Sequence, residues 1–326
     1  MQFLHNPNYD FLGKTRYLVS LSVLLIAAGT AYIASNGIHY GVEFSGGSQI
    51  ILRFQSRPAV DRVRDAVDKV VKGAVIQTYD NPDRNQVLVR LAQEAQVVSP
   101  APASTASPKP EDDLSGPTSA VKQALASSYP ENPVQESSAE IVGPVVGAEL
   151  RQKAIELTVL GLLFQLMYIG WRFKGAIWGA AAAIAVFHDV LITFGLLVML
   201  RYEITLNVIA ALLTLVGYSV NDTIVIFDRV RENLRQRRKD PLLKLINDSI
   251  NQTLSRTLIS SGTTFLTVLG LFLFGGEVLR GFGFTMVVGI VVGTYSTIYI
   301  ASPIVVWWHH WTRGRGANGG EAGKAA

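Results

Sequence analysis

The sequence predicts a polytopic α-helical membrane protein with six transmembrane helices and one external α+β (ferredoxin-like) domain between helices 1 and 2. Hydrophobic residues make up 49% of the 326 residues, and they gather in runs too long for a globular core. Between the first two runs lies a stretch of mixed composition that is long enough for a soluble domain. These runs exclude a soluble enzyme, and we expect no enzymatic activity.

Six apolar segments are predicted to cross the bilayer as helices. A helical span needs about 20 apolar residues. The candidates are residues 17–35, 155–170, 175–200, 204–227, 257–276 and 282–308. The second is short, so we expect helices 2–6 to begin at residue 150 and occupy residues 150–308. The first follows a short basic segment, but its apolar stretch is longer than a secretory signal core, which favours a retained signal anchor.

The distribution of positive charge predicts the orientation. Fifteen Lys and Arg residues lie in the tails and loops on one side of the spans, whereas the short loops on the other side carry only Arg201 and Arg280. The positive-inside rule therefore places three segments in the cytoplasm. They are the tails 1–16 and 309–326 and the loop 228–256. The large domain, residues 36–149, is then on the outside.

The predicted external domain alternates strands and helices. It opens with Gly41-Val-Glu-Phe-Ser-Gly-Gly47, whose paired glycines permit a tight turn. Strands and helices are expected in the order strand, helix, strand, strand, helix, strand, which is that of a split ferredoxin-like unit. Residues 93–118 are rich in Pro, Ala, Ser and acids and predict a flexible insertion, followed by a helix from about residue 118. Residues 141–149 contain Gly143-Pro144 and are interpreted either as a hinge or as a plain connector.

The fourth predicted span contains a carboxylate. Asp222 follows an apolar run that begins at Ile204, and the apolar residues 224–227 separate it from the charged exit at Asp228 and Arg229. At helical rise Asp222 lies about 10 Å before Arg229. A carboxylate at that depth is expensive and typical of a proton or ion path. The alternative is a water-facing residue at the end of a shorter span, because residues 204–221 alone are long enough to cross.

A guanidinium is predicted at a similar depth. Arg256 begins the fifth span, and the fourth and fifth helices run in opposite directions, so Asp222 and Arg256 both fall in the cytoplasmic half. Pairing between them is sterically reasonable. A nearby guanidinium favours an ionised carboxylate, so movement of Arg256 would load or release a proton. The alternative is that Arg256 reaches the membrane interface as a helix-end residue.

Three further polar residues are predicted to support this site. Asn221 directly precedes Asp222, and His188-Asp189 lies in the third span about 20 Å from Lys174, near the midplane. Two ionisable neighbours at that depth should not face lipid. The alternative for His188 and Asp189 is a polar pair hydrogen-bonded across a helix contact.

Several patterns that bind ligands in soluble proteins receive membrane interpretations here. Arg235-Gln-Arg-Arg-Lys239 resembles a nucleic-acid patch, but beside a membrane it is typical of attraction to acidic lipid, so we expect lipid and no nucleic acid as a partner. His309-His310 stands among interfacial tryptophans and is interpreted as a headgroup-level pair. Since there is no cysteine and no P-loop, we expect no metal and no cofactor other than a proton gradient.

Four motifs together resemble one family. They are Gly41-Val-Glu-Phe-Ser-Gly-Gly47, Gly217-Tyr-Ser-Val-Asn-Asp-Thr223, Phe227-Asp-Arg-Val-Arg-Glu-Asn233 and Ser255-Arg-Thr257. With the six spans, they are similar to the SecF family, the smaller membrane subunits of bacterial SecD–SecF export complexes, a branch of the resistance-nodulation-division (RND) superfamily. The resemblance covers nearly the whole chain. Glu43, where the family more often has Asp, and the insertion at 93–118 depart from it.

The resemblance implies a protein-translocation subunit driven by the proton-motive force. It implies SecD and the SecYEG translocon as partners, and exported unfolded polypeptide as the substrate that is drawn outward. Asp222 would be the proton-carrying carboxylate and Arg256 its partner, with no catalytic residue. The family also implies a location in the bacterial inner membrane, with the large domain in the periplasm.

Two other functions fit the same pattern. A non-transporting structural subunit would only stabilise SecD and the channel, and Asp222→Asn and Arg256→Ala would then change nothing that assembly does not explain. An RND-type transporter of small molecules or lipids is the other. If the neighbouring reading frame encodes a larger protein of the same topology with the export-type motif, the small-molecule or lipid transporter is disfavoured.

Overall fold

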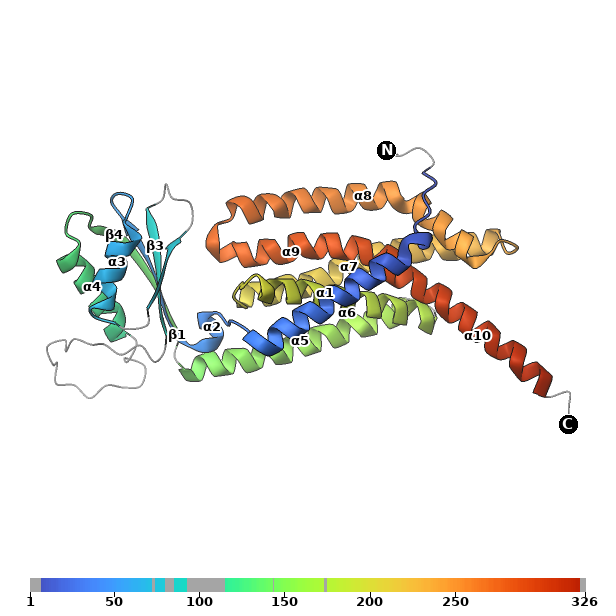
Figure 1. The fold of residues 1–326 in the computed structure, drawn as a ribbon, viewed down its shortest axis with the longest axis horizontal. Coiled ribbons are helices and arrows are strands. Elements are labelled where there is room, and N and C mark those ends of the chain that lie inside the picture. Colours follow the sequence, from blue (N-terminus) through green and yellow to red (C-terminus); the bar gives the residue numbers. More distant parts are fainter. Residues whose placement is uncertain are drawn as a thin grey trace.

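The computed structural model describes residues 7–71, 74–79, 85–92, 115–142, 144–172 and 175–322. In this part of the chain a small sheet domain sits at one end of a bundle of long helices (Figure 1). We call the end of the bundle beside the sheet the sheet end, and the opposite end the far end. Helix α1 starts and α10 ends toward the far end, as six crossings require (Figure 1).

Among the described residues, six helical segments are long and apolar enough to cross a membrane. They are Leu12–Asn36, Val146–Arg172, Ala176–Met199, Leu206–Gln236, Leu242–Phe274 and Val278–Thr312. The prediction of six spans is therefore confirmed, and the protein is a multi-pass membrane protein.

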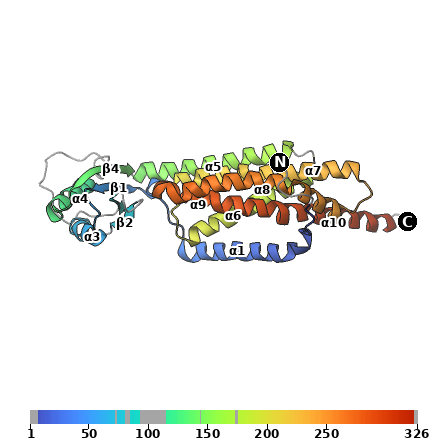
Figure 2. The ribbon, with the colours of Figure 1, turned by 90° about the horizontal axis from the view of Figure 1, so that it is seen from above.

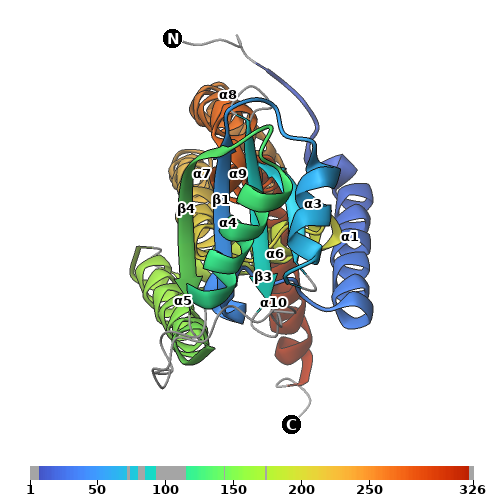
Figure 3. The same ribbon diagram turned by 90° about the vertical axis from the view of Figure 1, so that its left-hand side faces the viewer.

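The sheet domain has the predicted order of elements. They are β1 (Gly47–Phe54), α3 (Val60–Asp68), β2 (Val75–Tyr79), β3 (Gln86–Ala92), α4 (Ser115–Ser128) and β4 (Val134–Val142). The strands lie in the order β2-β3-β1-β4, with every neighbouring pair antiparallel. Helices α3 and α4 cover one face of the sheet (Figure 3). This arrangement is the split ferredoxin-like unit that the sequence predicts.

The core of the sheet domain follows from two periodicities. Along β1, Ile50, Leu52 and Phe54 alternate onto the covered face and are at most 1% exposed. On α3, Val63 and Val67 recur four residues apart and are fully buried against the same cluster. The strand and helix patterns therefore agree on a single core under the two helices.

The predicted insertion, residues 93–118, is wrong at its C-terminal end. Residues 93–114 lie outside the described residues, but 115–118 form the first turn of α4, which begins at Ser115. Pro117 is compatible with that turn because the first residues of a helix need no internal N–H partner.

The segment 141–149, interpreted as a hinge or a connector, is largely regular structure: residues 141–142 end β4 and residues 144–149 start the next helix. Helix α5 (Pro144–Arg172) begins at Pro144, so residues 144–149 belong to the second span and extend its short apolar run. Gly147 packs against the turn at Gly46, where a Cβ on Gly147 would lie 3.0 Å from the Gly46 nitrogen. Gly46 and Gly47 have φ angles of 73° and 126°, which confirms the predicted glycine turn after the short helix α2 (Val42–Ser45).

The bundle has interior and peripheral helices. Those labelled in Figure 1 are α1 (Thr15–Asn36), α5, α6 (Ala176–Met199), α7 (Leu206–Gln236), α8 (Leu242–Phe274), α9 (Gly276–Ser296) and α10 (Ser302–Ala322). Of the residues in the apolar stretch of each span, 44–56% are buried in α6, α7 and the last span, against 6–17% in α1, α5 and α8. Helices α1 and α5 flank the bundle on opposite sides (Figure 2). The interior contacts therefore lie among α6, α7 and α9.

Three helices extend beyond the apolar runs that predict them. Helix α7 continues to Gln236 and α8 begins at Leu242, so most of the predicted loop 228–256 is helical. Helix α10 continues to Ala322, so the predicted tail 309–326 is also largely helical. Hydropathy marks where a helix leaves apolar surroundings, whereas backbone hydrogen bonds and breakers mark where it ends. Residues 237–241 separate α7 from α8, and Pro241 is the N-cap residue of α8.

The last span contains a π-helical turn, Thr297–Ala301, between α9 and α10. The Ser302 backbone N–H and its side-chain hydroxyl both donate to the Thr297 carbonyl, the hydroxyl at 2.9 Å. This turn lies beside α6 and α7, and such turns frequently occur at functional sites.

Candidate proton-transfer site in the helical bundle

Asp222 lies inside the bundle and not at a helix end. Its side chain belongs to α7, is 4% exposed, and accepts a hydrogen bond from the Ser261 hydroxyl of α8 at 2.8 Å. Helix α7 continues past it through the buried residues Ile226 and Phe227. The geometry therefore removes the alternative of a water-facing end cap, and it leaves a carboxylate in the contact between two antiparallel helices.

Arg256 stands near this carboxylate without touching it. It lies on α8, five residues before Ser261, which is about 7.5 Å of helical rise. Its side chain is exposed, and a Coulombic interaction with Asp222 is present. Within the described residues no hydrogen bond or ion pair joins the two side chains. The structure thus brings Arg256 to the neighbouring helix but does not close the predicted pair.

Asn221 does not contribute to the buried site. It precedes Asp222 on α7, but its side chain is exposed on the outside of the bundle. Successive residues on a helix point about 100° apart, so a neighbour in sequence need not share a face. Among the described residues, no hydrogen bond of the Asn221 side chain supports the predicted role.

His188 and Asp189 form a separate buried cluster. On α6, Asp189 is 0% exposed and His188 is 7% exposed, and Nδ1 of His188 lies 2.9 Å from Oδ1 of Asp189. The other carboxylate oxygen, Oδ2, accepts from the hydroxyl of Ser219 on α7 at 2.5 Å and from that of Ser296 on α9 at 2.9 Å. The predicted alternative, a polar pair bonded across a helix contact, describes this geometry.

One face of α7 connects the two carboxylate sites. Ser219 and Asp222 are three residues apart, so they are neighbours on the helix surface. Next to them, the hydroxyl of Thr223 is 3.0 Å from that of Thr297 at the start of the π-helical turn. Close helix packing supports this seam, because a Cβ on Gly293 of α9 would lie 3.2 Å from the Cβ of Ser219.

Sequence reasoning missed the hydroxyl partners. Ser261 stands in the run Ser260-Ser261-Gly262-Thr263-Thr264, and Ser296 is followed by Thr297, both inside apolar spans. Clusters of small polar residues in a span are the signal that could have found them, since such residues hydrogen-bond across membrane helices. Their pairing with a particular carboxylate depends on helix packing, which the sequence pattern does not display.

The far end of the bundle carries ion pairs between helices. Arg172 of α5 pairs with Asp228 of α7 at 2.6 Å, and Arg231 of α7 stacks over the Trp178 ring of α6 at 5.5 Å. Arg237 lies just beyond α7. Its hydrogen bonds to Asp248, and to a smaller extent to Asp240, raise its pKa. These contacts hold α5, α6, α7 and α8 in register at this end.

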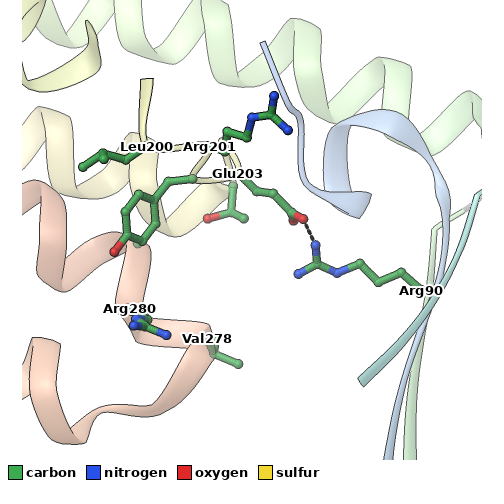
Figure 4. A pocket seen from close by; sticks show the side chains of 9 residues that line it. Arg90, Leu200, Arg201, Glu203, Val278 and Arg280 are labelled. Carbon is green, nitrogen blue, oxygen red and sulfur yellow. Dashed lines mark ion pairs between the residues drawn. The ribbon is translucent and has the colours of Figure 1, made fainter. Parts of the chain in front are cut away.

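At the sheet end, an open polar pocket of about 390 Å³ separates the sheet domain from the bundle (Figure 4). Arg90 of β3 reaches into it and pairs with Glu203, in the connection between α6 and α7 (Figure 4). The same connection forms a bridge in which the Gly41 N–H donates to the Ile204 carbonyl at 2.9 Å. The sheet domain is thereby joined to the segment that starts α7.

Comparison with known proteins identifies the family. A family model described as "Protein export membrane protein SecD/SecF, C-terminal" matches residues 120–311, and a model described as "SecD/SecF GG Motif" matches residues 31–56. The protein translocase subunit SecF of Koribacter versatilis is 36% identical over 97% of this chain and 95% of its own length. That of Calditerrivibrio nitroreducens is 40% identical over 92% of this chain and 94% of its own length.

The chain belongs to the SecF family.

A solved structure agrees with this assignment. The crystal structure of SecDF from Thermus thermophilus, described as a translocon-associated membrane protein, is 37% identical and matches with a TM-score of 0.77. The match covers 95% of this chain but 40% of that one. The Thermus protein, whose relative in the sequence comparison is named protein translocase subunit SecDF, therefore contains a region similar to this chain and a longer region that this chain does not match.

Proposed function

We propose that this SecF-family chain is one subunit of a protein-translocation accessory complex that uses the proton-motive force. Its partner is a SecD subunit, and the complex assists the export of unfolded polypeptide through the SecYEG channel of the bacterial inner membrane. Both chain ends are cytoplasmic and the sheet domain is periplasmic, in keeping with the fifteen-to-two charge distribution. The names of the SecF and SecDF relatives support the partner and the pathway.

The observation that carries the proton-driven part is the buried carboxylate of Asp222. It is 4% exposed, and among the described residues its one hydrogen-bond donor is Ser261. An ionised carboxylate with one hydroxyl donor is poorly compensated in a membrane interior, so protonation changes its interaction energy with the bundle strongly. We propose that Asp222 carries the proton and that Arg256 approaches it when the proton leaves.

Contacts at the start of α7 support a connection between this site and the sheet domain. Helix α7 carries Asp222. Glu203 and Ile204, just before the start of α7, contact Arg90 and Gly41 beside the sheet. We propose that a change at Asp222 reaches the sheet domain through α1 and α5, the first and second spans, and also through α7.

The experiment is export by proteoliposomes that contain the chain with its SecD partner and the translocon, measured with and without an imposed proton gradient. Asp222→Asn removes the exchangeable proton and keeps the shape, so we expect loss of the gradient-dependent stimulation with normal assembly. Asp248→Asn, a matched change at a partly exposed carboxylate, should keep the stimulation. Full stimulation in Asp222→Asn would refute proton carriage and leave the purely structural subunit as the better description.

A further inference from the structure

A second titratable centre lies in the bundle interior, apart from Asp222. Helix α6 runs through the interior, and at its middle it presents His188 and Asp189, both buried. Two adjacent ionisable side chains in a membrane interior are costly and mark functional positions. The packing of α6 against α9 and α7 places them where lipid cannot reach.

The hydrogen bonds around Asp189 favour its carboxylate form. Oδ2 receives two hydroxyl hydrogens, from Ser219 and Ser296, and Oδ1 faces Nδ1 of His188. The Ser219 bond, at 2.5 Å, has the length of a bond between a hydroxyl and an ionised carboxylate. With Asp189 ionised, Nδ1 of His188 carries a hydrogen and donates it to Oδ1.

The other ring nitrogen of His188, Nε2, differs from Nδ1 in its surroundings. Nε2 of His188 is buried and has no hydrogen-bond partner among the residues that the structure describes. In the neutral ring with a hydrogen on Nδ1, Nε2 is an acceptor with a free lone pair. A buried polar atom without a partner requires an explanation, and an acceptor of this kind is where an incoming proton would bind.

The helices packed on α6 bring few other titratable groups to this place. From α9, the Tyr295 ring lies 5.8 Å from that of His188, but its hydroxyl contacts Ser22 and donates to the Leu18 carbonyl at 3.1 Å. From α7, the nearest carboxylate is Asp222, which is bonded to Ser261. Residues 18–31 of α1 and 157–167 of α5 contain no titratable residue, and Tyr299 comes from the π-helical turn.

We propose that His188 and Asp189 form a second proton-binding site of the membrane bundle, in which the proton binds at Nε2 of His188. Binding converts a neutral imidazole and a carboxylate into an imidazolium and a carboxylate, so the net charge of the pair changes from minus one to zero. Asp189 is a positioning residue that orients the ring and stabilises the imidazolium. The inference rests on the proposed proton-driven function. Ser219, which binds Asp189, and Asp222 lie on one face of α7, so a charge change at the His188–Asp189 pair or at Asp222 acts on the same helix.

The test is nitrogen-15 solid-state nuclear magnetic resonance of the full chain, with its partner subunit, in lipid bilayers and with labelled histidines. The chain has five histidines, and His188→Gln assigns the buried one by removing its signal. As the pH is lowered over the range in which the complex stays folded, we expect the His188 signal to convert from neutral imidazole to imidazolium. In Asp189→Asn this conversion should be lost over the same range. A wild-type His188 that stays neutral throughout would overturn the proposal.

Export measured on the same samples tests whether the site is used. His188→Gln keeps an N–H donor toward Asp189 but binds no proton, so gradient-dependent stimulation should be lost although the complex assembles. His310→Gln, a change at an exposed histidine of α10, should leave the stimulation intact. Full stimulation in His188→Gln would overturn the site's use in the cycle. Absence of stimulation in the wild type would instead refute the proposed function, and the resonance titration would still decide whether His188 binds a proton.

Discussion

The contact between α1 and α6 allows one prediction to be worked through in detail. The two helices touch at Gly29 and Gly195, and a Cβ on Gly29 would lie 2.9 Å from the Cα of Gly195. A Cβ on Gly195 would lie 3.3 Å from the Cα of Gly29. Ordinary contacts begin at 3.4 Å. The backbone therefore has to move in Gly29→Ala, whereas a shift of about a tenth of an ångström accommodates Gly195→Ala.

The magnitude follows from two opposing terms. Overpacking of a tight contact costs about 1–3 kcal/mol, while replacing a mid-helix Gly by Ala gains up to about 1 kcal/mol of helix propensity. Gly270→Ala on α8 serves as the control, because a Cβ there has open space. Since the propensity term is shared, Gly29→Ala should be less stable than Gly270→Ala by about 1–3 kcal/mol. Gly195→Ala should lie between them.

The assay is reversible unfolding of the full chain in mixed micelles, followed by tryptophan fluorescence as the denaturing detergent increases. The expected order of stability is Gly270→Ala, then Gly195→Ala, then Gly29→Ala. Equal stability of Gly29→Ala and Gly270→Ala would refute the close approach of α1 to α6. A Gly195→Ala variant that is the least stable of the three would refute the asymmetry of that contact.

Two further predictions concern the two ends of the molecule. Ile50→Ala removes a fully buried side chain from the core of the sheet domain and should cost about 2–5 kcal/mol; limited proteolysis should then cut this domain faster, and an unchanged cleavage rate would contradict its single core. Arg172→Gln breaks the pair with Asp228, whose side chains are 35% and 43% exposed. It should cost no more than about 1 kcal/mol and less at high salt, so a larger, salt-independent loss in the same unfolding assay would contradict a solvent-screened pair.

The sequence allowed the spans and the sheet domain to be predicted because both rest on repeating patterns. Runs of about 20 apolar residues mark helices in lipid whatever their neighbours are. Alternation in residues 50–54 and four-residue spacing between Val63 and Val67 mark the two faces of one core. Helix ends were predicted less well, as the continuation of α7 from residue 228 to residue 236 shows, because a helix can continue into water while its hydropathy falls.

The sequence predicted how deep Asp222 lies in the bundle, but not which side chains hydrogen-bond to the buried carboxylates. The distance of Asp222 from the charged exit predicted its burial, since helical rise is constant. Its actual donor, Ser261, and the serines that hold Asp189 come from other helices, and their choice depends on crossing angles and helix rotation. Arg256 was predicted to reach Asp222, and the structure places it nearby without contact, so the pairing stays a prediction.

The length of α7 has a mechanical consequence. It is one uninterrupted helix of 31 residues, about 46 Å from end to end, with the Thr205 hydroxyl capping its first turn through Val208. A straight helix transmits an axial push or a rotation with little compression, because its hydrogen bonds all run along the axis. An axial displacement of α7 beside Asp222 would therefore reach the α6–α7 connection at Ile204 with little loss of amplitude. Such a displacement would act on the sheet domain through the Arg90–Glu203 pair and the Gly41–Ile204 hydrogen bond.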